Sequence, residues 1–259
     1  MGDMLQGRVA VVTGAGTGLG RAHAIGMAAQ GARVVVNDIG TSWDGIGTDD
    51  SPGDQVVDII KRSGGIAVAS HDSVATEESA RRIIQTAIDN FGRIDILVNN
   101  AGIIRNQPIY EVPPGDWDAV IRTHFYGTFF CTRFAAPHMK EQGYGRIINT
   151  SSHIGFGFRG QSTYSAAKEG ITGFSRSIAR DMGRFGVTCN VIRPIAAWRG
   201  IPDNMKNERI ESLRTEDVAA FVVYLASESA GNINGCIFEV FRGHIGIFVE
   251  PPPVAQSRT

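Results

Sequence analysis

The sequence predicts an α/β fold in which a doubly wound parallel sheet is flanked by helices. Short apolar runs alternate with longer helical patterns along the chain, which is typical of βαβ units around such a sheet. The run Ala32–Asn37 is rich in consecutive valines, as expected of a strand that is buried on both faces. The chain has 259 residues and no linker-like stretch, so we expect residues 1–259 to form a single domain.

The expected elements follow one another in this alternating order. The expected strands are Arg8–Thr13, Ala32–Asn37, Ala67–Ser70, Ile94–Asn99, Arg146–Thr150, Val187–Ile192 and Cys236–Phe241. The expected helices are Leu19–Gln30, Gln55–Arg62, Glu77–Asn90, Asp116–Lys140, Thr163–Gly183 and Thr215–Ala226. A polar insertion at 39–54 is predicted to be a surface loop. The tail at 247–259 contains Pro251–Pro253, cannot continue a helix or strand, and is a candidate for wrapping over a neighbouring subunit.

The composition argues against several classes of function. Hydrophobic residues make up 42% and charged residues 20% of a chain whose net charge is -1, so no nucleic-acid surface is expected. Three widely spaced cysteines, Cys131, Cys189 and Cys236, form no C-x-x-C pair, which argues against disulfides and a zinc cluster. No apolar run reaches the roughly 18 residues of a membrane helix. The first strand leaves no room for a signal peptide. We therefore expect a cytoplasmic protein without a metal, membrane or nucleic-acid partner.

A glycine-rich segment between the first strand and the first helix predicts a dinucleotide site. The segment Thr13–Gly20 has glycine at every second position from Gly14 onward. Glycine lets the backbone turn tightly and approach a pyrophosphate held at a helix N-terminus. The candidate binding residues are Gly14, Gly16, Thr17, Gly18, Leu19 and Gly20. A purely structural strand-to-helix turn is the alternative interpretation.

Asp38 stands at the end of the second expected strand, about twenty residues beyond these glycines. A carboxylate at this place accepts hydrogen bonds from the adenosine ribose and repels a 2′-phosphate, which predicts NAD rather than NADP. The alternative is that Asp38 caps the following turn, with Asp44 and Asp49 close by in sequence. The insertion that follows Asp38 is expected to lie near the cofactor.

The segment Ser151–Lys168 carries the candidate catalytic residues. Tyr164 and Lys168 are four residues apart and share one face of the expected helix. A neighbouring ammonium favours the phenolate and is expected to lower the pKa of the tyrosine, which is near ~10 when unperturbed. A serine at the end of the preceding strand, Ser151 or Ser152, is placed to hold a substrate oxygen. A structural tyrosine and lysine on an amphipathic helix is the alternative.

This order of serine, tyrosine and lysine, in a chain that opens with VVTGAGTGLG, resembles the short-chain dehydrogenase/reductase family. The resemblance implies a Rossmann-like fold, with Tyr164 as general acid and base and Lys168 bound to the nicotinamide ribose. The family pattern Ser-Ser-x-x-Gly indicates Ser152, whereas the usual spacing to the tyrosine indicates Ser151; we favour Ser152. The cofactor residues implied by the resemblance are Asp72 and Ser73 near the adenine, Asn99, Ala101 and Gly102 along the cofactor, and Tyr164, Lys168 and Pro194 near the nicotinamide.

His124 occupies the place where many family members have a catalytic asparagine. Histidine there resembles a subgroup formed by the dehydrogenase domains of multifunctional enzyme type 2, which handle (3R)-hydroxyacyl-CoA. A purely structural histidine is the alternative. The substrate segment, 195–214, departs from the family pattern after Pro194 and is short, which suggests an open cleft for a bulky or thioester substrate. The candidate CoA-phosphate ligands are Arg105, Arg159, Arg193 and Arg199.

These patterns leave three functions open. The first is an NAD-dependent oxidoreductase that interconverts a secondary alcohol and a ketone, with a 3-hydroxyacyl-CoA or related acyl thioester as substrate. The second acts on a steroid, terpenoid or other cyclic alcohol, and the third is a non-catalytic dinucleotide-binding module. Phenylalanines at 125, 129, 130 and 134, with Ile171, Phe174 and Ile178, either pack on the sheet or form subunit contacts. The habit of the resembled family favours a homodimer or homotetramer.

Overall fold

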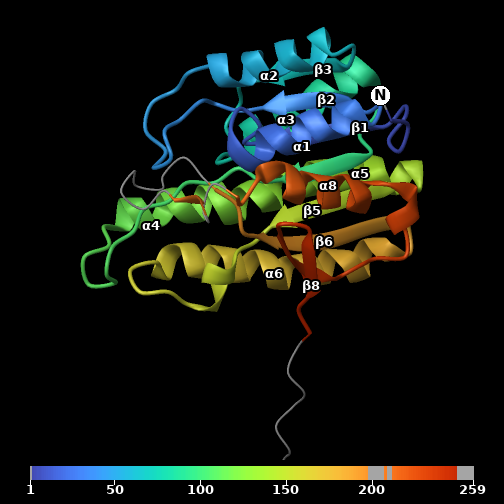
Figure 1. The fold of residues 1–259 in the computed structure, drawn as a ribbon. Helices are drawn as coiled ribbons and strands as arrows, with labels where there is room; N and C mark the ends of the chain where they lie inside the picture. Colours follow the sequence, from blue (N-terminus) through green and yellow to red (C-terminus); the bar gives the residue numbers. More distant parts are fainter. Residues whose placement is uncertain (1, 198–206, 209–211, 250–259) are drawn as a thin grey trace, which may run out of the picture.

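The computed structural model describes residues 2–197, 207–208 and 212–249. The described strands form an eight-stranded sheet in the order β3-β2-β1-β4-β5-β6-β7-β8 (Figure 1). Adjacent strands are parallel from β3 to β7, and β8 runs antiparallel to β7. The strands are β1 (Val9–Thr13), β2 (Arg33–Asn37), β3 (Ile66–Ser70), β4 (Ile96–Asn99), β5 (Gly145–Thr150), β6 (Val187–Pro194), β7 (Ile237–Phe241) and β8 (His244–Ile247). The predicted α/β fold with a doubly wound sheet is confirmed.

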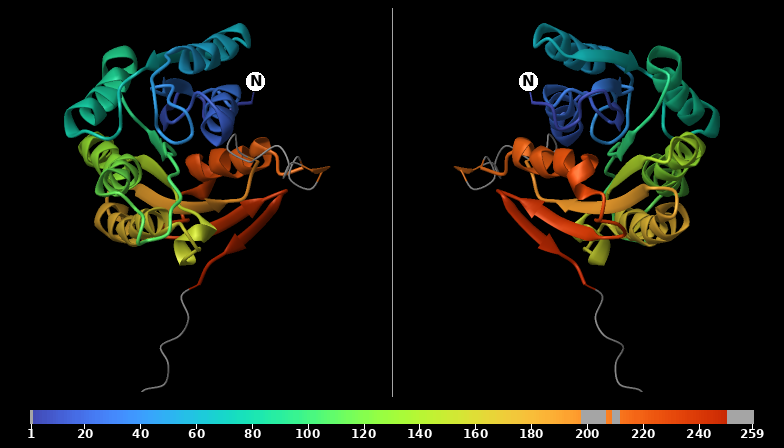
Figure 2. Two further views of the ribbon diagram at one scale, coloured as in Figure 1. Left: turned by 90° about the vertical axis from the view of Figure 1, so that its left-hand side faces the viewer. Right: turned by 90° about the vertical axis from the view of Figure 1, so that its right-hand side faces the viewer.

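Helices cover both faces of the sheet (Figure 2). The helices are α1 (Gly18–Ala29), α2 (Ser51–Arg62), α3 (Glu77–Phe91), α4 (Pro114–Ile121), α5 (Gly127–Gln142), α6 (Ser162–Gly183) and α8 (Thr215–Ala226). Because side chains alternate along a strand, β1 sends Ala10 and Val12 into the core under α1, α2 and α8, and Val9 and Val11 into the core under α3, α5 and α6. These two cores hold the sheet between its helical layers.

Three elements differ from the sequence-based expectation. Helix α2 begins at Ser51 rather than Gln55, because Pro52 occupies its first turn, where a missing N–H costs nothing. The expected helix Asp116–Lys140 begins at Pro114 and passes through a π-helical turn, η1 (Arg122–Tyr126), between α4 and α5. Strand β8 was not expected. It pairs with β7 through a two-residue turn in which Arg242 and Gly243 both have positive φ.

The sheet gathers the carboxyl ends of its parallel strands at one edge. The strand order reverses between β1 and β4, and ligands of such sheets bind in the crevice outside the strand ends at this point. The turns after Thr13, Asn37 and Asn99 therefore meet there, and the segment after Thr150 follows on the next strand. None of the described helices combines the length and apolar character needed to cross a membrane. The tail beyond Val249 and most of the segment 195–214 lie outside the described residues.

Candidate active site

A cavity of about 430 Å³ lies at this edge of the sheet, between the ends of β2 and β4. Of the predicted cofactor residues, Gly14, Thr17, Gly18, Leu19, Asp38, Asp72, Ser73, Ala101 and Gly102 line it. The backbone around the first glycines needs residues without side chains, because a Cβ on Gly20 would come within 2.0 Å of the Gly14 carbonyl oxygen. Gly14 itself has φ +63, which favours glycine. The turn thus leaves the N-terminus of α1 open to the cavity, as a pyrophosphate requires.

Asp38 connects the glycine-rich segment with the insertion. Its carboxylate accepts hydrogen bonds from the backbone N–H of Gly16 at 2.7 Å and of Gly40 at 2.7 Å. The neighbouring candidates Asp44 and Asp49 bond instead to Ser42 and Ser51 of their own loop. Neither is among the described residues that line the cavity, whereas Asp38 is. Asp38 therefore caps the turn, as the alternative interpretation held, and also faces the cavity.

The insertion after β2 forms one wall of the cavity. Its residues Thr41, Trp43 and Gly45 line the cavity. The Trp43 carbonyl oxygen accepts a hydrogen bond from the Ile104 N–H at 3.0 Å, and the Asp44 carbonyl accepts one from Arg105 Nε at 2.9 Å. The loop thus spans from the β2 side of the site to the segment after β4. Its last residues, 51–54, belong to α2.

The candidate CoA-phosphate ligands differ in how accessible they are. Arg105 is engaged, because its Nη1 donates to Asp116 Oδ1 at 2.7 Å in addition to its bond to Asp44. Arg193 is buried. Arg159 is exposed, and Arg199 lies outside the described residues. Arg159 is thus exposed but outside the described cavity lining, whereas Arg105 belongs to the lining with its side chain already paired.

The two asparagines after β4 have different places. Asn99 is buried, and its side-chain amide donates to Thr132 and Asn149 rather than facing the cavity. Asn100 lines the cavity and donates to the carbonyl oxygens of Thr13 and Gly14, both at 3.1 Å. The prediction for Asn99 is therefore not supported by the geometry, and Asn100 takes that place. A strand alternates its side chains, but the turn at its end breaks that alternation, so the sequence could not distinguish the two.

Asp72 and Ser73 line the cavity at the end of β3 with their side chains already engaged. Asp72 Oδ1 accepts a hydrogen bond from Arg82 Nε at 2.7 Å, and Ser73 Oγ accepts one from the Ala75 N–H at 3.2 Å. Pro194 ends β6 outside the described lining, and Ala196 and Ala197 after it belong to the lining. Within the described part of the chain, no group of three or more His, Cys, Asp or Glu side chains is placed to hold a metal ion.

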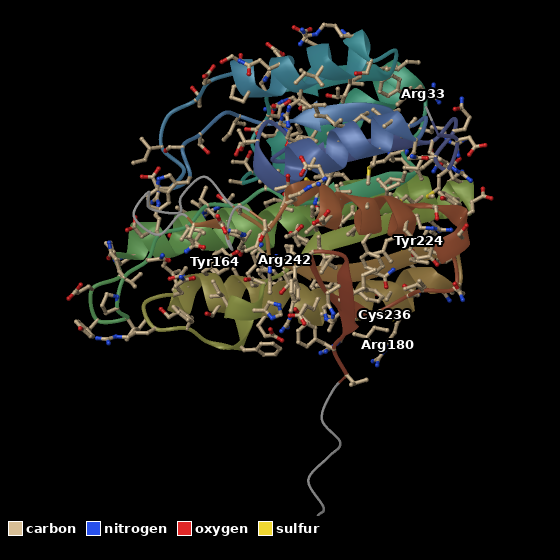
Figure 3. The ribbon with its side chains drawn as sticks, viewed as in Figure 1. Arg33, Tyr164, Arg180, Tyr224, Cys236 and Arg242 are labelled. Carbon is tan, nitrogen blue, oxygen red and sulfur yellow. The ribbon has the colours of Figure 1, made fainter. Side chains whose placement is uncertain are left out.

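The candidate catalytic side chains come from two neighbouring elements. Ser152 is the N-cap of a 3-10 turn, η2 (His153–Phe156), that follows β5. Tyr164 and Lys168 lie in the first two turns of α6, and Figure 3 labels Tyr164. Ser152 hydrogen-bonds to the Tyr164 side chain. Lys168 Nζ donates to the Thr150 carbonyl oxygen at 2.7 Å and lies 5.4 Å from the centre of the Tyr164 ring. None of the three belongs to the cavity lining. His124 links the group to it, because it contacts Tyr164 and the backbone of Ile103, a lining residue.

The pKa of Tyr164 differs from the sequence-based expectation. Burial raises it to about 12, and the hydrogen bond from Ser152 acts in the opposite direction. Lys168 does not supply the expected lowering, because burial also lowers the pKa of its ammonium, to about 7. In the protein alone the phenol is therefore protonated at neutral pH, and burial favours the neutral form of the lysine. A tyrosine in this state is ready to donate a proton to a substrate oxygen.

Ser151 and Ser152 have separate environments. Ser151 is buried; its hydroxyl donates to the Lys168 carbonyl oxygen at 2.8 Å and lies 3.2 Å from Thr172 Oγ1. The Ser152 hydroxyl accepts a hydrogen bond from the Ile154 N–H at 3.2 Å and meets Tyr164. Only Ser152 of the two thus reaches the tyrosine. Counting back from the tyrosine by the usual family spacing indicates Ser151, whereas the contact with Tyr164 supports Ser152.

His124 lies in the π-helical turn and contacts Tyr164 by its ring edge, with ring centres 5.1 Å apart. Its Nε2 lies 2.7 Å from the Ile103 carbonyl oxygen and 3.0 Å from the Ile103 N–H. Burial lowers its pKa to about 3, so the ring is neutral at neutral pH. A Cβ on Gly102 would come within 2.3 Å of the imidazole. This geometry favours a structural role, in which His124 fixes the segment after β4 beside the tyrosine.

Two buried histidines predict a loss of stability in mild acid. His23 in α1 has no hydrogen-bond partner for either ring nitrogen among the described residues, and its pKa falls to about 3, as for His124. Between pH 6.5 and 3 the unfolded chain binds these protons and the folded chain does not, so stability falls as pH decreases. We expect about 2 kcal/mol lost per histidine at pH 5. Urea unfolding at pH 7 and pH 5 measures it, and His23→Leu should remove about half of the loss; an equal loss in that variant would contradict this account.

Comparisons with known proteins identify the family of this chain. A family model described as short chain dehydrogenase matches residues 8–198. The chain belongs to this family. Members of the family bind nicotinamide dinucleotides. The predicted family and the predicted enzyme class, an oxidoreductase acting on CH–OH groups, are thereby confirmed.

Three individual proteins are similar to the chain over most of its length. Peroxisomal multifunctional enzyme type 2 of Mus musculus is 46% identical over 241 residues, which are 93% of this chain and 32% of that protein. The chain thus spans about a third of the length of this relative. Hydroxyacyl-CoA dehydrogenase ChsB1 of Mycobacterium tuberculosis is 38% identical over 263 residues, which cover 96% of this chain and 81% of that protein. A solved short chain dehydrogenase from Mycobacterium avium is 42% identical, with a TM-score of 0.85 over 99% of this chain and 90% of that one.

Proposed function

We propose that this chain is an NAD-dependent oxidoreductase that interconverts a secondary alcohol and a ketone, with a 3-hydroxyacyl-CoA or related acyl thioester as substrate. The observation that carries this proposal is the group of Ser152, Tyr164 and Lys168 beside a cavity whose glycine-rich turn and Asp38 suit a dinucleotide. The nicotinamide cofactor, when bound, supplies the hydride chemistry. The name of the similar hydroxyacyl-CoA dehydrogenase favours the thioester over a steroid, terpenoid or other cyclic alcohol.

The chain's own residues would handle the substrate oxygen and its proton. The Ser152 hydroxyl holds the oxygen, and the Tyr164 hydroxyl donates a proton to it or takes one from it, depending on the direction of the reaction. Lys168 titrates near neutral pH, so its Nζ can accept or return a proton on the side facing the Thr150 carbonyl. When charged, it favours the phenolate that alcohol oxidation requires. A buried lysine beside a tyrosine favours an enzyme over a non-catalytic module.

We expect Asp38 to set the preference for NAD. The variant Asp38→Ser removes the negative charge beside the ribose site, so the preference for NAD over NADP should fall by roughly 100-fold. Titrations of NADH and NADPH affinity measure this ratio. Asp49→Ser is the matched control, since it removes a carboxylate from the same loop, away from the described cavity lining. An unchanged ratio in Asp38→Ser would show that another group sets the cofactor preference.

A spectrophotometric screen tests the reaction itself. The protein is supplied with NAD or NADP and a panel of 3-hydroxyacyl-CoA esters, steroids and simple secondary alcohols, and reduced cofactor is followed by its absorbance. Reduction with the CoA esters alone supports the proposal, and reduction with cyclic alcohols favours the second function. A protein that binds NADH but turns over none of the panel would favour the non-catalytic module.

We also propose that helices α5 and α6 form a contact between subunits of a homodimer or homotetramer. Ile171 is buried, but Phe129 is 38% exposed and its ring lies 6.3 Å from that of Phe174 on the neighbouring helix. Phe125 also meets Phe174 edge-to-face. Such an aromatic face is better covered by a second subunit than by water. Light scattering of the variant Phe129→Ser tests this subunit contact through the mass of the oligomer. The cytoplasmic location stays a prediction.

A further inference from the structure

Arg193 is a buried arginine at the end of β6, directly before Pro194. Its side chain is 2% exposed, and its Nη2 donates to Glu169 Oε2 at 2.7 Å. The guanidinium carbon lies 4.1 Å from the centre of the Phe156 ring and 4.9 Å from that of Phe248. The cation is therefore held by a carboxylate from α6, a ring from η2 and a ring from the segment after β8.

Stability does not account for this arginine. Its Nε and Nη1 are buried and have no hydrogen-bond partner among the residues the structure describes, which costs free energy. Burial lowers the pKa of the guanidinium, because the charged form loses its hydration in the protein interior. Its ion-pair partner Glu169 is 46% exposed, so the carboxylate only partly offsets the cost of burying the arginine. Features that cost stability tend to lie where function requires them.

The contacts of Arg193 lead to both segments that carry the catalytic group. Glu169 directly follows Lys168, and Arg193 Nη2 also lies 3.4 Å from Thr172 Oγ1. That hydroxyl donates to the Lys168 carbonyl oxygen at 3.2 Å. Phe156 ends the η2 turn that Ser152 caps. A single side chain thus touches the helical turn of Lys168 and the loop of Ser152.

The C-terminal hairpin packs on the same loop. The His153 ring, next to Ser152, lies 5.5 Å from the Phe248 ring, and its Nε2 is 3.0 Å from Glu239 Oε2. Glu239 on β7 is the sheet partner of Arg193 on β6. Phe248 therefore contacts the loop directly, through His153 and Phe156, and indirectly through Arg193.

We propose that Arg193 is a positioning residue for catalysis, which fixes the Ser152 loop relative to the Lys168 turn, and that Phe248 completes its support. This proposal rests on the proposed function. It assigns the C-terminal hairpin, which lies at the edge of the sheet, a role in holding the catalytic serine. Because misplacing a catalytic group by about 1 Å can cost roughly 100-fold in rate, the effect belongs in kcat rather than in cofactor affinity.

The experiment compares Arg193→Met, Arg193→Lys and Phe248→Ala with the wild-type protein. Met keeps the length of the side chain without the charge, and Lys keeps the ion pair with Glu169 without the planar face. Ile247→Ala is the matched control, because Ile247 directly precedes Phe248 and is 62% exposed. We measure kcat, KM, NADH affinity and hydrogen exchange of the peptide 152–157 by mass spectrometry. Hydrogen exchange can be measured without a substrate, so it tests the proposal even if the wild-type protein shows no turnover.

We expect Arg193→Met to lose roughly 10- to 100-fold in kcat, with NADH affinity within about twofold and faster exchange in 152–157. Phe248→Ala should show the same pattern with a smaller loss of kcat. Arg193→Lys should lose less kcat than Arg193→Met, and Ile247→Ala should show no change. Faster exchange with unchanged kcat, or unchanged exchange, would overturn the proposal. So would a uniform rise in exchange across the chain with parallel loss of NADH binding, since that indicates general destabilisation. A wild-type protein without turnover refutes the proposed function, while the exchange data still report on the support itself.

Discussion

The variant Tyr164→Phe is expected to lose about 10³-fold in kcat while its NADH affinity stays within about twofold. The substitution removes only the hydroxyl that meets Ser152 and leaves the ring that packs against His124. Without that hydroxyl the group loses the proposed proton donor and acceptor for the substrate oxygen. Steady-state kinetics with the substrate identified by the screen, together with an NADH fluorescence titration, measure the two quantities.

The pH dependence of the same variant gives a second readout. In the wild-type protein, burial raises the pKa of Tyr164, so alcohol oxidation should accelerate as pH rises and more phenolate forms. Tyr164→Phe should lose this acceleration. Tyr224→Phe is the matched control, because Tyr224 lies on α8, well separated from Tyr164 (Figure 3). Equal activity of Tyr164→Phe and the wild-type protein would refute the mechanism.

The second large effect is expected from comparing the kinetics and stability of Ser152→Ala and Ser151→Ala. Ser152→Ala removes the hydroxyl that meets Tyr164, and we expect kcat/KM to fall by about 10²-fold or more with little change in stability. Ser151→Ala removes a buried hydroxyl that bonds to the Lys168 carbonyl oxygen. We expect it to lower the free energy of unfolding by about 1 kcal/mol and to leave kcat/KM within about threefold.

Each serine variant is the control for the other, since the residues are adjacent and the chemical change is identical. The measurements are kcat/KM and urea unfolding of both variants. A larger kinetic loss in Ser151→Ala than in Ser152→Ala would reverse the assignment. Equal kinetic losses would show that the loop as a whole, rather than one hydroxyl, supports the reaction.

The sequence predicted the parts of this protein that depend on local patterns. The alternation of elements, the glycine turn and the Tyr164–Lys168 spacing follow from rules that act within a few residues, so the fold and the placement of both side chains on one helix could be inferred. The start of α2 was missed although Pro52 signalled it. Strand β8 was missed because its turn, Arg242-Gly243, lacks the asparagine or aspartate that usually marks such hairpins.

The tertiary structure alone decided what each polar side chain faces. The choice between Ser151 and Ser152, the exchange of Asn99 for Asn100 and the engagement of Arg105 depend on contacts between segments far apart in the chain. The same is true of the pKa of Tyr164: the sequence shows a lysine four residues away, but burial of both groups raises the pKa of the phenol and lowers that of the ammonium. Spacing determines which residues share a face, whereas desolvation and hydrogen-bond partners come from packing, which no local pattern encodes.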